Sequence, residues 1–320
     1  QFHDILPGSS ITQVYHDALP EWEEVQQVGN RILDDALRAI ASHITLPQPP
    51  EPNTIPIIIF NSLNWERSEV IHIIMNRKER KEREVKRVSE GAFVSSHIFS
   101  LEDQSWKVYD VQGNEVTTQQ TANSLLFFAT VPSIGYQIYW LSPTSEKSNI
   151  AKNELPKNWT LENEYLQVKI NPQTGDIDSI FDKNQQREIL NGAGNQLQAF
   201  QDSGQYWDAW NIDPNYSTKP LPLSELLSIQ WLEHGEIQQN LQVIRKIGKS
   251  EFTQNYILQK NTPILKIKNT VNWQENQVLV KTSFPLNFTT ETATYEIPCG
   301  VINRPTNPQT PAEQAKWEVP

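Results

Sequence analysis

The sequence is poor in cysteine, in long apolar runs and in net positive charge, and each shortage excludes a class of protein. Cys299 is the single cysteine among 320 residues, so the chain can form no internal disulfide and no thiolate cluster around a metal. No apolar run approaches the roughly 18 residues of a membrane-spanning helix. Acidic residues outnumber basic ones by 38 to 27, for a net charge of -11, which argues against nucleic acid or an anionic membrane as partner.

Several enzyme motifs are also missing. The sequence contains no HExxH, no CxxC, no GxSxG and no glycine-rich phosphate loop, which excludes the sites that these motifs build. His43, His72, His97 and His234 are not spaced as metal ligands. We expect Cys299 to be a small buried residue rather than a nucleophile.

Residues 9–44 are predicted to be helical. Ser9 or Ser10 is a suitable N-cap after a Pro-Gly turn, and Pro20 is expected to begin a second helix at its first turn. Beyond Pro20, apolar residues recur at intervals of three and four, which predicts one buried face. The face consists of Trp22, Val25, Val28, Ile32, Leu33, Ala36, Leu37 and Ile40. Because such a face needs partner helices and the chain begins with Gln, we expect a C-terminal fragment whose helical partners lie upstream.

After the helix, four prolines between Leu46 and Pro52 predict a stiff, extended linker. From residue 55 the sequence pattern changes to that of short strands, which are predicted at 57–60, 70–74, 106–111, 125–131 and 136–141. The charge run 77–87 is expected to be a solvated loop or a short exposed helix. Its mixed signs and its lack of aromatic residues argue against nucleic-acid binding. We therefore predict the end of a helical domain over 1–46, a linker over 47–54 and a small β domain over 55–145.

A large antiparallel β-sandwich is predicted over 157–320. Residues 161–170 alternate as a half-buried strand does, a turn follows at 171–176, and 177–182 form the return strand. Further short strands are expected at 241–247, 252–259, 264–270, 278–283 and 295–298. Many short strands without helical periodicity favour a sandwich, so the whole chain is predicted to be mainly β with a short N-terminal helical segment.

Two stretches carry residues suited to chemistry. In the first, His3 offers an imidazole, the commonest protein ligand for metals, and Asp4 offers a carboxylate that accepts hydrogen bonds from sugar hydroxyls. One histidine does not make a zinc site, which needs three or four ligands. The second stretch, 202–213, combines Tyr206, two tryptophans and three aspartates, Asp208 among them. Aromatic rings and carboxylates suit a saccharide, but a satisfied core explains Trp and Tyr equally well.

Four motifs, in the same order, resemble glycoside hydrolase family 38, the alpha-mannosidases, and its bacterial and cytosolic branch in particular. Residues 1–18, QFHDILPGSSITQVYHDA, are similar to the segment that supplies the last zinc ligand of the family. NSLNWER at 61–67, the stretch 194–213 with YWDAWNID, and ATYEIPCGVINRPT at 293–306 resemble family motifs of the β domains. The hairpin 161–182 resembles the opening of carbohydrate-active, galactose-mutarotase-like β-sandwiches.

The resemblance implies a site and an activity. His3 would be one ligand of a zinc ion, Asp4 would bind the sugar, and Tyr206 and Asp208 would face the substrate or support residues that do. The full-length enzyme would be a retaining, cytoplasmic alpha-mannosidase acting on alpha-mannosides or manno-oligosaccharides, with nucleophile and acid/base upstream of Gln1. The fragment alone would then be inactive. Assembly of the enzyme into a homo-oligomer is possible and is not decided by these residues.

Two other interpretations are compatible with these residues. The chain could be a non-catalytic carbohydrate-binding β-sandwich, with the aromatic cluster around Trp207 binding the sugar and His3 only packing. It could also be a structural β domain that supports another. Arg304 is expected to tether a strand end rather than to meet a ligand.

Overall fold

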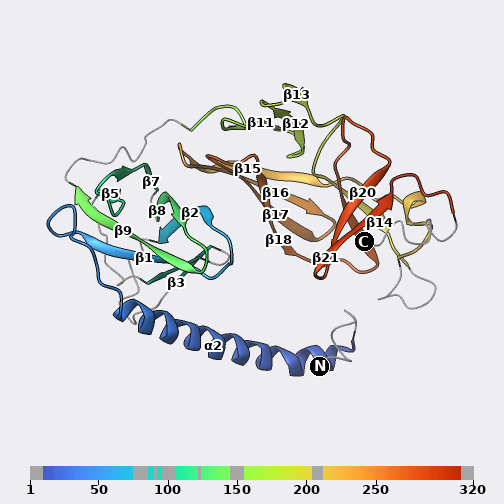
Figure 1. Cartoon of the computed structure of the whole chain (residues 1–320). Helices are drawn as coiled ribbons and strands as arrows, with labels where there is room; N and C mark the ends of the chain where they lie inside the picture. Colours follow the sequence, from blue (N-terminus) through green and yellow to red (C-terminus); the bar gives the residue numbers. More distant parts are fainter. Residues whose placement is uncertain are drawn as a thin grey trace.

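The computed structural model describes residues 10–74, 86–89, 92–95, 105–121, 124–144, 155–203 and 212–310. These residues form one long helix and a set of antiparallel sheets (Figure 1), which confirms the predicted mainly β fold with a short N-terminal helical segment. The helix is α2 (Thr12–Ser42). The first group of strands is β1 (Ile55–Asn61), β2 (Arg67–Ile74), β3 (Lys86–Ser89), β4 (Ala92–Ser95), β5 (Ser105–Tyr109), β6 (Glu115–Val116), β7 (Thr118–Gln120), β8 (Ser124–Val131) and β9 (Gly135–Thr144).

The second group of strands follows from residue 160. It consists of β10 (Thr160–Glu162), β11 (Leu166–Ile170), β12 (Ile177–Asp182), β13 (Arg187–Glu188), β14 (Gln196–Gln201), β15 (Glu225–His234), β16 (Gln238–Ile247), β17 (Ser250–Gln259), β18 (Leu265–Asn272), β19 (Val278–Ser283), β20 (Thr292–Ile297) and β21 (Gly300–Pro305). A 3-10 helix, η1 (Tyr216–Thr218), lies between β14 and β15. No helix among the described residues has the length and apolar character needed to cross a membrane.

Helix α2 runs without interruption through Pro20, so the prediction of a second helix starting there is wrong. Proline removes one backbone donor, and because Pro20 is exposed, water can reach the carbonyl group left without that donor. The N-cap prediction is also wrong: Ile11 precedes the first helical residue and makes no side-chain capping bond, and neither Ser9 nor Ser10 is the cap.

The predicted buried face of α2 is covered only near the C-terminal end of the helix. Ala18 and Leu37 are buried, whereas Trp22, Val25 and Ile32 are exposed. The apolar period is therefore real, but among the described residues most of the predicted face is left exposed; burial is found near Leu37 at the C-terminal end and at Ala18, outside that face, near the start of the helix. The cluster that covers this end consists of Leu33, Leu37, Ala41, Ile44, Ile58, Phe60, Tyr109, Val111, Ile138 and Trp140.

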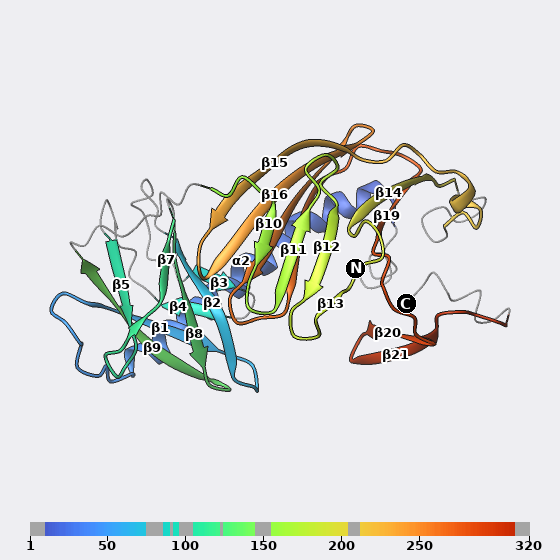
Figure 2. The ribbon, with the colours of Figure 1, turned by 90° about the horizontal axis from the view of Figure 1, so that it is seen from above.

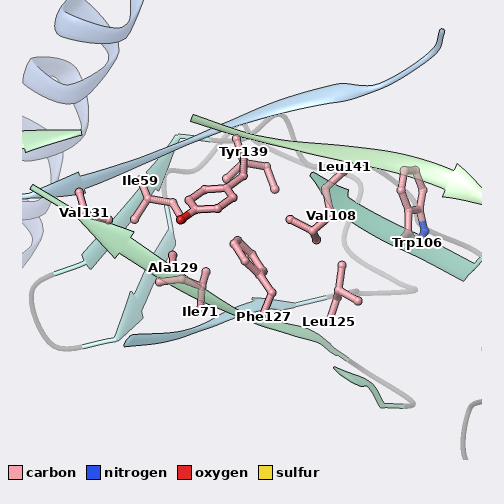
Figure 3. Packing of buried hydrophobic residues seen from close by; sticks show 11 residues of the cluster. Ile59, Ile71, Trp106, Val108, Leu125, Phe127, Ala129, Val131, Tyr139 and Leu141 are labelled. Carbon is pink, nitrogen blue, oxygen red and sulfur yellow. The ribbon is translucent and has the colours of Figure 1, made fainter. Parts of the chain in front are cut away.

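The first strands form two sheets that pack face to face. One has the order β3-β4-β1-β9-β5-β6 and the other the order β2-β8-β7, and apolar side chains fill the space between them (Figure 3). The rings of Phe127 and Tyr139 meet edge to face there, with centroids 5.1 Å apart. The buried members are Ile57, Ile59, Ile71, Trp106, Val108, Leu125, Phe127, Ala129, Val131, Tyr139 and Leu141.

The linker after α2 is tied to this small β region. The carboxylate of Glu51 accepts hydrogen bonds from Ser142 Oγ at 2.7 Å and from Tyr109 Oη at 3.3 Å. Ser142 lies on β9 and Tyr109 on β5, so one linker residue contacts two neighbouring strands. Of the charge run 77–87, only Lys86 and Arg87 are described; they belong to β3 rather than to a loop or a helix.

The later strands form the large sandwich (Figure 2). Its two main sheets have the orders β10-β11-β12-β13 and β15-β16-β17-β18, and β14 pairs with β19 beyond them. Alternate residues of these strands point into a shared core, as the period of two predicts. The buried members are Leu161, Leu166, Val168, Ile170, Ile177, Leu190, Trp231, Leu241, Val243, Tyr256 and Leu258.

The stretch 161–170, predicted as one strand, is a hairpin of β10 and β11. Asn163 makes the turn because its Oδ1 accepts the backbone N–H groups of Tyr165 and Leu166, at 2.9 and 2.8 Å. Its Nδ2 donates to the carbonyl oxygen of Gln259 at 2.7 Å, which fixes the turn to the end of β17. An asparagine that bonds its own backbone in this way competes with the strand ladder.

We predict that Phe127→Ala lowers the free energy of unfolding by about 3–5 kcal/mol, because it empties the centre of the small β core. Urea denaturation followed by tryptophan fluorescence measures this loss. The matched control is Phe288→Ala, which truncates an exposed phenylalanine and should change stability by less than about 1 kcal/mol. Equal losses in the two variants would contradict the packing described here.

Candidate functional site

The four predicted site residues, His3, Asp4, Tyr206 and Asp208, lie outside the described residues. The tryptophans of the same stretch, Trp207 and Trp210, do so as well. The structure does describe the residues that flank the segment 204–211. We call these flanking residues, 202–203 and 212–219, the base of the segment.

Two aspartates close the base of this segment. The backbone N–H of Asp213 donates to Oδ1 of Asp202 at 2.8 Å, which joins the residues on either side of it. The N–H of Asp202 donates to the carbonyl oxygen of Gln277 at 2.8 Å, immediately before β19. The residues on the two sides of the segment are therefore bonded to each other, and Asp202 is also bonded to the residue that precedes β19.

The carboxylate of Asp213 is engaged on both oxygens. Oδ2 forms an ion pair with Lys219 Nζ at 2.6 Å, and Oδ1 accepts the N–H of Asn215 at 2.9 Å. The hydrogen bond from Lys219, followed by that from Asn215, lowers the pKa of Asp213. This carboxylate therefore stays ionised, and it serves the base rather than donating a proton to a ligand.

The 3-10 helix η1 continues the base. The ring of Tyr216 meets that of Phe200 edge to face, with centroids 5.2 Å apart, and Lys281 Nζ donates to the Tyr216 hydroxyl at 2.5 Å. Phe200 lies on β14 and Lys281 on β19. Both paired strands thus contact the chain as it returns from the segment 204–211.

A buried polar network holds the start of β14 in the sandwich. Arg245 is fully buried on β16, and its Nη1 donates to Asp176 Oδ1 at 2.5 Å. Its Nε donates to Gln254 Oε1 and its Nη2 to the carbonyl oxygen of Asn195, both at 2.9 Å. A buried guanidinium needs such partners, because each unmet donor would lose its hydration without compensation.

Tyr256 completes this network. Its hydroxyl donates to the carbonyl oxygen of Gly175 at 2.9 Å and accepts a hydrogen bond from Asn195 Nδ2 at 2.6 Å. Burial raises the pKa of Tyr256, so the hydroxyl remains a donor at neutral pH. The backbone of Gly175 lies close to the side chain of Val243. Gly175 has φ +76°, and a Cβ there would lie 2.5 Å from Val243 Cγ1, so a larger residue does not fit.

Sequence reasoning missed this network. The sequence predicts only a turn at Asp176, and Arg245 belongs to none of the motifs. A signal exists, because Leu241, Val243 and Ile247 occupy the inward positions of β16 and Arg245 has the same parity. An arginine at an inward position of an alternating strand indicates a buried charge with a partner elsewhere.

Cys299 and Arg304 both lie among the described residues. Cys299 is exposed in the turn between β20 and β21, with φ +60°, so the prediction that it is buried is wrong. The turn places it at a hairpin tip, away from any core. The guanidinium of Arg304 lies 5.7 Å from the ring centroid of Tyr295 on the paired strand, a packing contact in line with the tether expected of it.

The described residues include no group of three or more His, Cys, Asp or Glu side chains that could hold a metal ion. This part of the chain therefore does not fit a complete zinc site, and the predicted ligand His3 lies outside it.

Two family models match the chain. That of the Glycosyl hydrolases family 38 C-terminal domain matches residues 161–320, and that of the alpha mannosidase middle domain matches residues 1–40. The first covers the large sandwich together with the segment 204–211. The second covers most of helix α2 and the stretch that contains His3.

Similar proteins are longer than this chain. Alpha-mannosidase 2C1 of Mus musculus is 27% identical, over all of this chain and 27% of its own length. Alpha-mannosidase G of Dictyostelium discoideum is 25% identical, over all of this chain and 30% of its own length. The chain thus spans about a quarter of these relatives.

Solved structures have the same fold. The crystal structure of an alpha-mannosidase from Enterococcus faecalis V583 aligns with a TM-score of 0.64 at 15% identity, covering 93% of this chain and 39% of that one. A second structure from Enterococcus faecalis, of a protein in the glycosyl hydrolase family 38, aligns with a TM-score of 0.66.

We predict that Asp176→Ala lowers the free energy of unfolding by about 3–5 kcal/mol, because it leaves the Arg245 charge buried without its partner. Urea denaturation measures the loss. Asp178→Ala is the control: Asp178 is exposed two residues away and bonds the Asn171 side chain, so its removal should cost less than about 1 kcal/mol. Equal, small losses would show that the pair does not matter.

A second prediction concerns acid stability. Because the folded-state pKa of Asp213 is lowered, its contribution is present above the unfolded pKa and is lost as the pH falls through the folded pKa. Asp213→Asn should therefore lower the melting temperature at neutral pH and flatten its decline between about pH 5 and pH 2. Lys219→Met should behave alike. If the melting temperatures of the wild type and both variants declined equally with falling pH, the role of this ion pair would be refuted.

Proposed function

The chain belongs to glycosyl hydrolase family 38, and we propose that it forms the middle and C-terminal part of an alpha-mannosidase that hydrolyses alpha-mannosides or manno-oligosaccharides. The observation that carries this proposal is the match of the family's C-terminal domain over 161–320, preceded in the right order by its middle domain over 1–40. Relatives that cover the whole chain bear the name alpha-mannosidase.

We further propose that the enzyme retains anomeric configuration and depends on zinc. Retention needs a nucleophilic and an acid/base carboxylate about 5 Å apart, and these would come from the part of the enzyme that this chain does not span. His3 would be one zinc ligand, and the bound ion would orient vicinal sugar hydroxyls and stabilise charge. Asp4 would accept a hydrogen bond from the sugar, and the chain alone would be inactive.

The segment 204–211 is proposed to contribute Tyr206 and Asp208 to the sugar site. The base of this segment supports the choice of Asp208. Of the three aspartates in 202–213, Asp202 and Asp213 are both engaged in closing the base. Asp208 is the remaining one, and a carboxylate beside aromatic rings is suited to a sugar hydroxyl. We also propose that the enzyme works in the cytoplasm, in line with its single cysteine.

The test is hydrolysis of 4-nitrophenyl alpha-mannoside by the full-length protein, with and without added zinc. His3→Ala should lower kcat/KM by about 100-fold or more and reduce the bound zinc, because a ligand is lost. The matched control is His43→Ala: His43 is exposed at the end of α2, and among the described residues its ring bonds the Ser42 hydroxyl and the carbonyl oxygen of Ala39, both in the last turn of the helix. Activity should be unchanged in this variant.

The other outcomes are equally informative. Full activity and full zinc content in His3→Ala would contradict the assignment of His3 as a ligand. Absence of hydrolysis in the wild type, together with mannose binding that is lost in Asp208→Ala, would favour the non-catalytic carbohydrate-binding sandwich. Absence of both hydrolysis and binding would favour a purely structural β domain.

A further inference from the structure

The small β region and the large sandwich meet at a contact that we call the joint, defined by His72, Gln119, Gly235, Ile237 and Gln238. The first two residues lie on β2 and β7 of the small region. The other three lie in and next to the turn between β15 and β16 of the sandwich. The joint has a polar half and an apolar half.

The side-chain amide of Gln119 forms the polar half. Its Oε1 accepts the backbone N–H groups of Ile237 and Gln238, both at 2.9 Å. Its Nε2 donates to the carbonyl oxygen of Gln238 at 3.0 Å. One side chain therefore bonds the backbone of the turn three times, much as a neighbouring strand would.

Gly235 allows this close approach. A Cβ at this position would lie 2.2 Å from both Cδ and Oε1 of Gln119, far inside van der Waals contact. Because three hydrogen bonds hold the end of Gln119, the amide could make room only by giving them up.

The apolar half lies on the same face of the small sheet as His72. Ile237 is buried against Val70 and Leu126, with Phe128 beside them. His72 is two residues from Val70 on β2, so both side chains point to the sandwich. Opening of the joint would expose this cluster to water.

His72 lies beside both halves, because His72 on β2 and Gln119 on β7 pair with Leu126 of β8 from its two sides. In the turn, the side chain of Gln238 donates to Glu233 Oε2 at 2.7 Å and accepts from Gln259 Nε2 at 2.8 Å. Burial lowers the pKa of His72; the charge of Glu233 opposes this effect and that of Lys266, on β18, adds to it. Burial dominates, so the closed joint favours the neutral imidazole.

We propose that the joint is an acid-sensitive hinge, in which protonation of His72 separates Gln119 from the 235–238 turn and frees the small β region to move relative to the sandwich. The sign follows from linkage. In the open joint His72 regains its ordinary pKa of about 6.5, so below that pH the open state binds a proton that the closed state lacks. Opening is then favoured by up to about tenfold per pH unit, down to the lowered pKa of the closed state.

Hydrogen exchange of the Ile237 and Gln238 amides, measured by NMR on the whole chain, reports the joint directly because both donate to Gln119. Expressed as protection factors, the protection of both amides should fall by at most about tenfold per pH unit below about pH 6.5 and should level off below the lowered pKa of His72. The Leu241 amide, inside β16 and opposite Tyr256, should keep its protection. Unchanged protection of Ile237 and Gln238 across this range would overturn the proposal.

Two variants identify His72 as the titrating group. His72→Gln keeps a hydrogen-bonding side chain without the charge, and should abolish the pH dependence at Ile237 and Gln238. Glu233→Gln removes the charge that holds the pKa of His72 up, so the loss of protection should continue to lower pH than in the wild type. A wild-type pH dependence in both variants would assign the titration to another group and overturn the proposal.

A double-mutant cycle tests whether Gln119 closes the joint. Gly235→Ala alone should lower the protection of both amides at neutral pH, because the added methyl group displaces Gln119. In the Gln119→Ala background the same substitution should have little further effect, since the displaced group is already absent. Additive effects would mean that Gln119 does not occupy the observed place in solution, which also overturns the proposal.

Discussion

The buried guanidinium of Arg245 is the interaction on which the large sandwich depends. It binds Asp176 from the turn before β12, Gln254 from β17 and the backbone of Asn195 at the start of β14. Three separate segments are thus held to one charge in a region of low polarity, where hydrogen bonds are strong and missing ones are costly. The network also excludes sliding of β16 by one residue, because such a shift would expose Val243 and turn Arg245 outward.

Strand β14 connects the Arg245 network with the candidate site. Asn195 precedes the strand, and Asp202 follows it and closes the base of the segment 204–211 with Asp213. Helix α2 starts beneath the sandwich and ends against the small β region, as Figures 1 and 2 show. The end of the helix, the two small sheets and the 235–238 turn pack on one another in this order, with an apolar cluster at each contact.

Much of the fold could be predicted because strands and helices leave periodic patterns of apolar residues. Strands are found around Ile57, Leu125, Val243 and Tyr256, where the sequence predicts short segments rich in apolar residues. The period of α2 predicted a helix correctly but not its burial, because burial depends on a partner that local sequence does not reveal. Asn163 forms a turn inside a predicted strand, because its side chain accepts hydrogen bonds from the backbone two and three residues later. The alternating residues on both sides of Asn163 give no sign of this turn.

The site was less accessible to such reasoning. Spacing did not identify His3, Asp4, Tyr206 or Asp208 as functional; a resemblance did, and their roles stay predictions. The aspartates at 202 and 213 looked equivalent to Asp208 in the sequence, and only their contacts separate them. Gln119 was invisible because its role depends on a glycine more than a hundred positions away.

The most direct test of the account is a crystal structure of the full-length protein with a bound, slowly hydrolysed alpha-mannoside. The account predicts an imidazole nitrogen of His3 at about 2.0–2.1 Å from a zinc ion. It also predicts the carboxylate of Asp208 within about 3.2 Å of a polar group of the sugar or of a residue that binds it. A sugar bound far from both His3 and Asp208 would contradict the central claim that these two segments build one mannoside site.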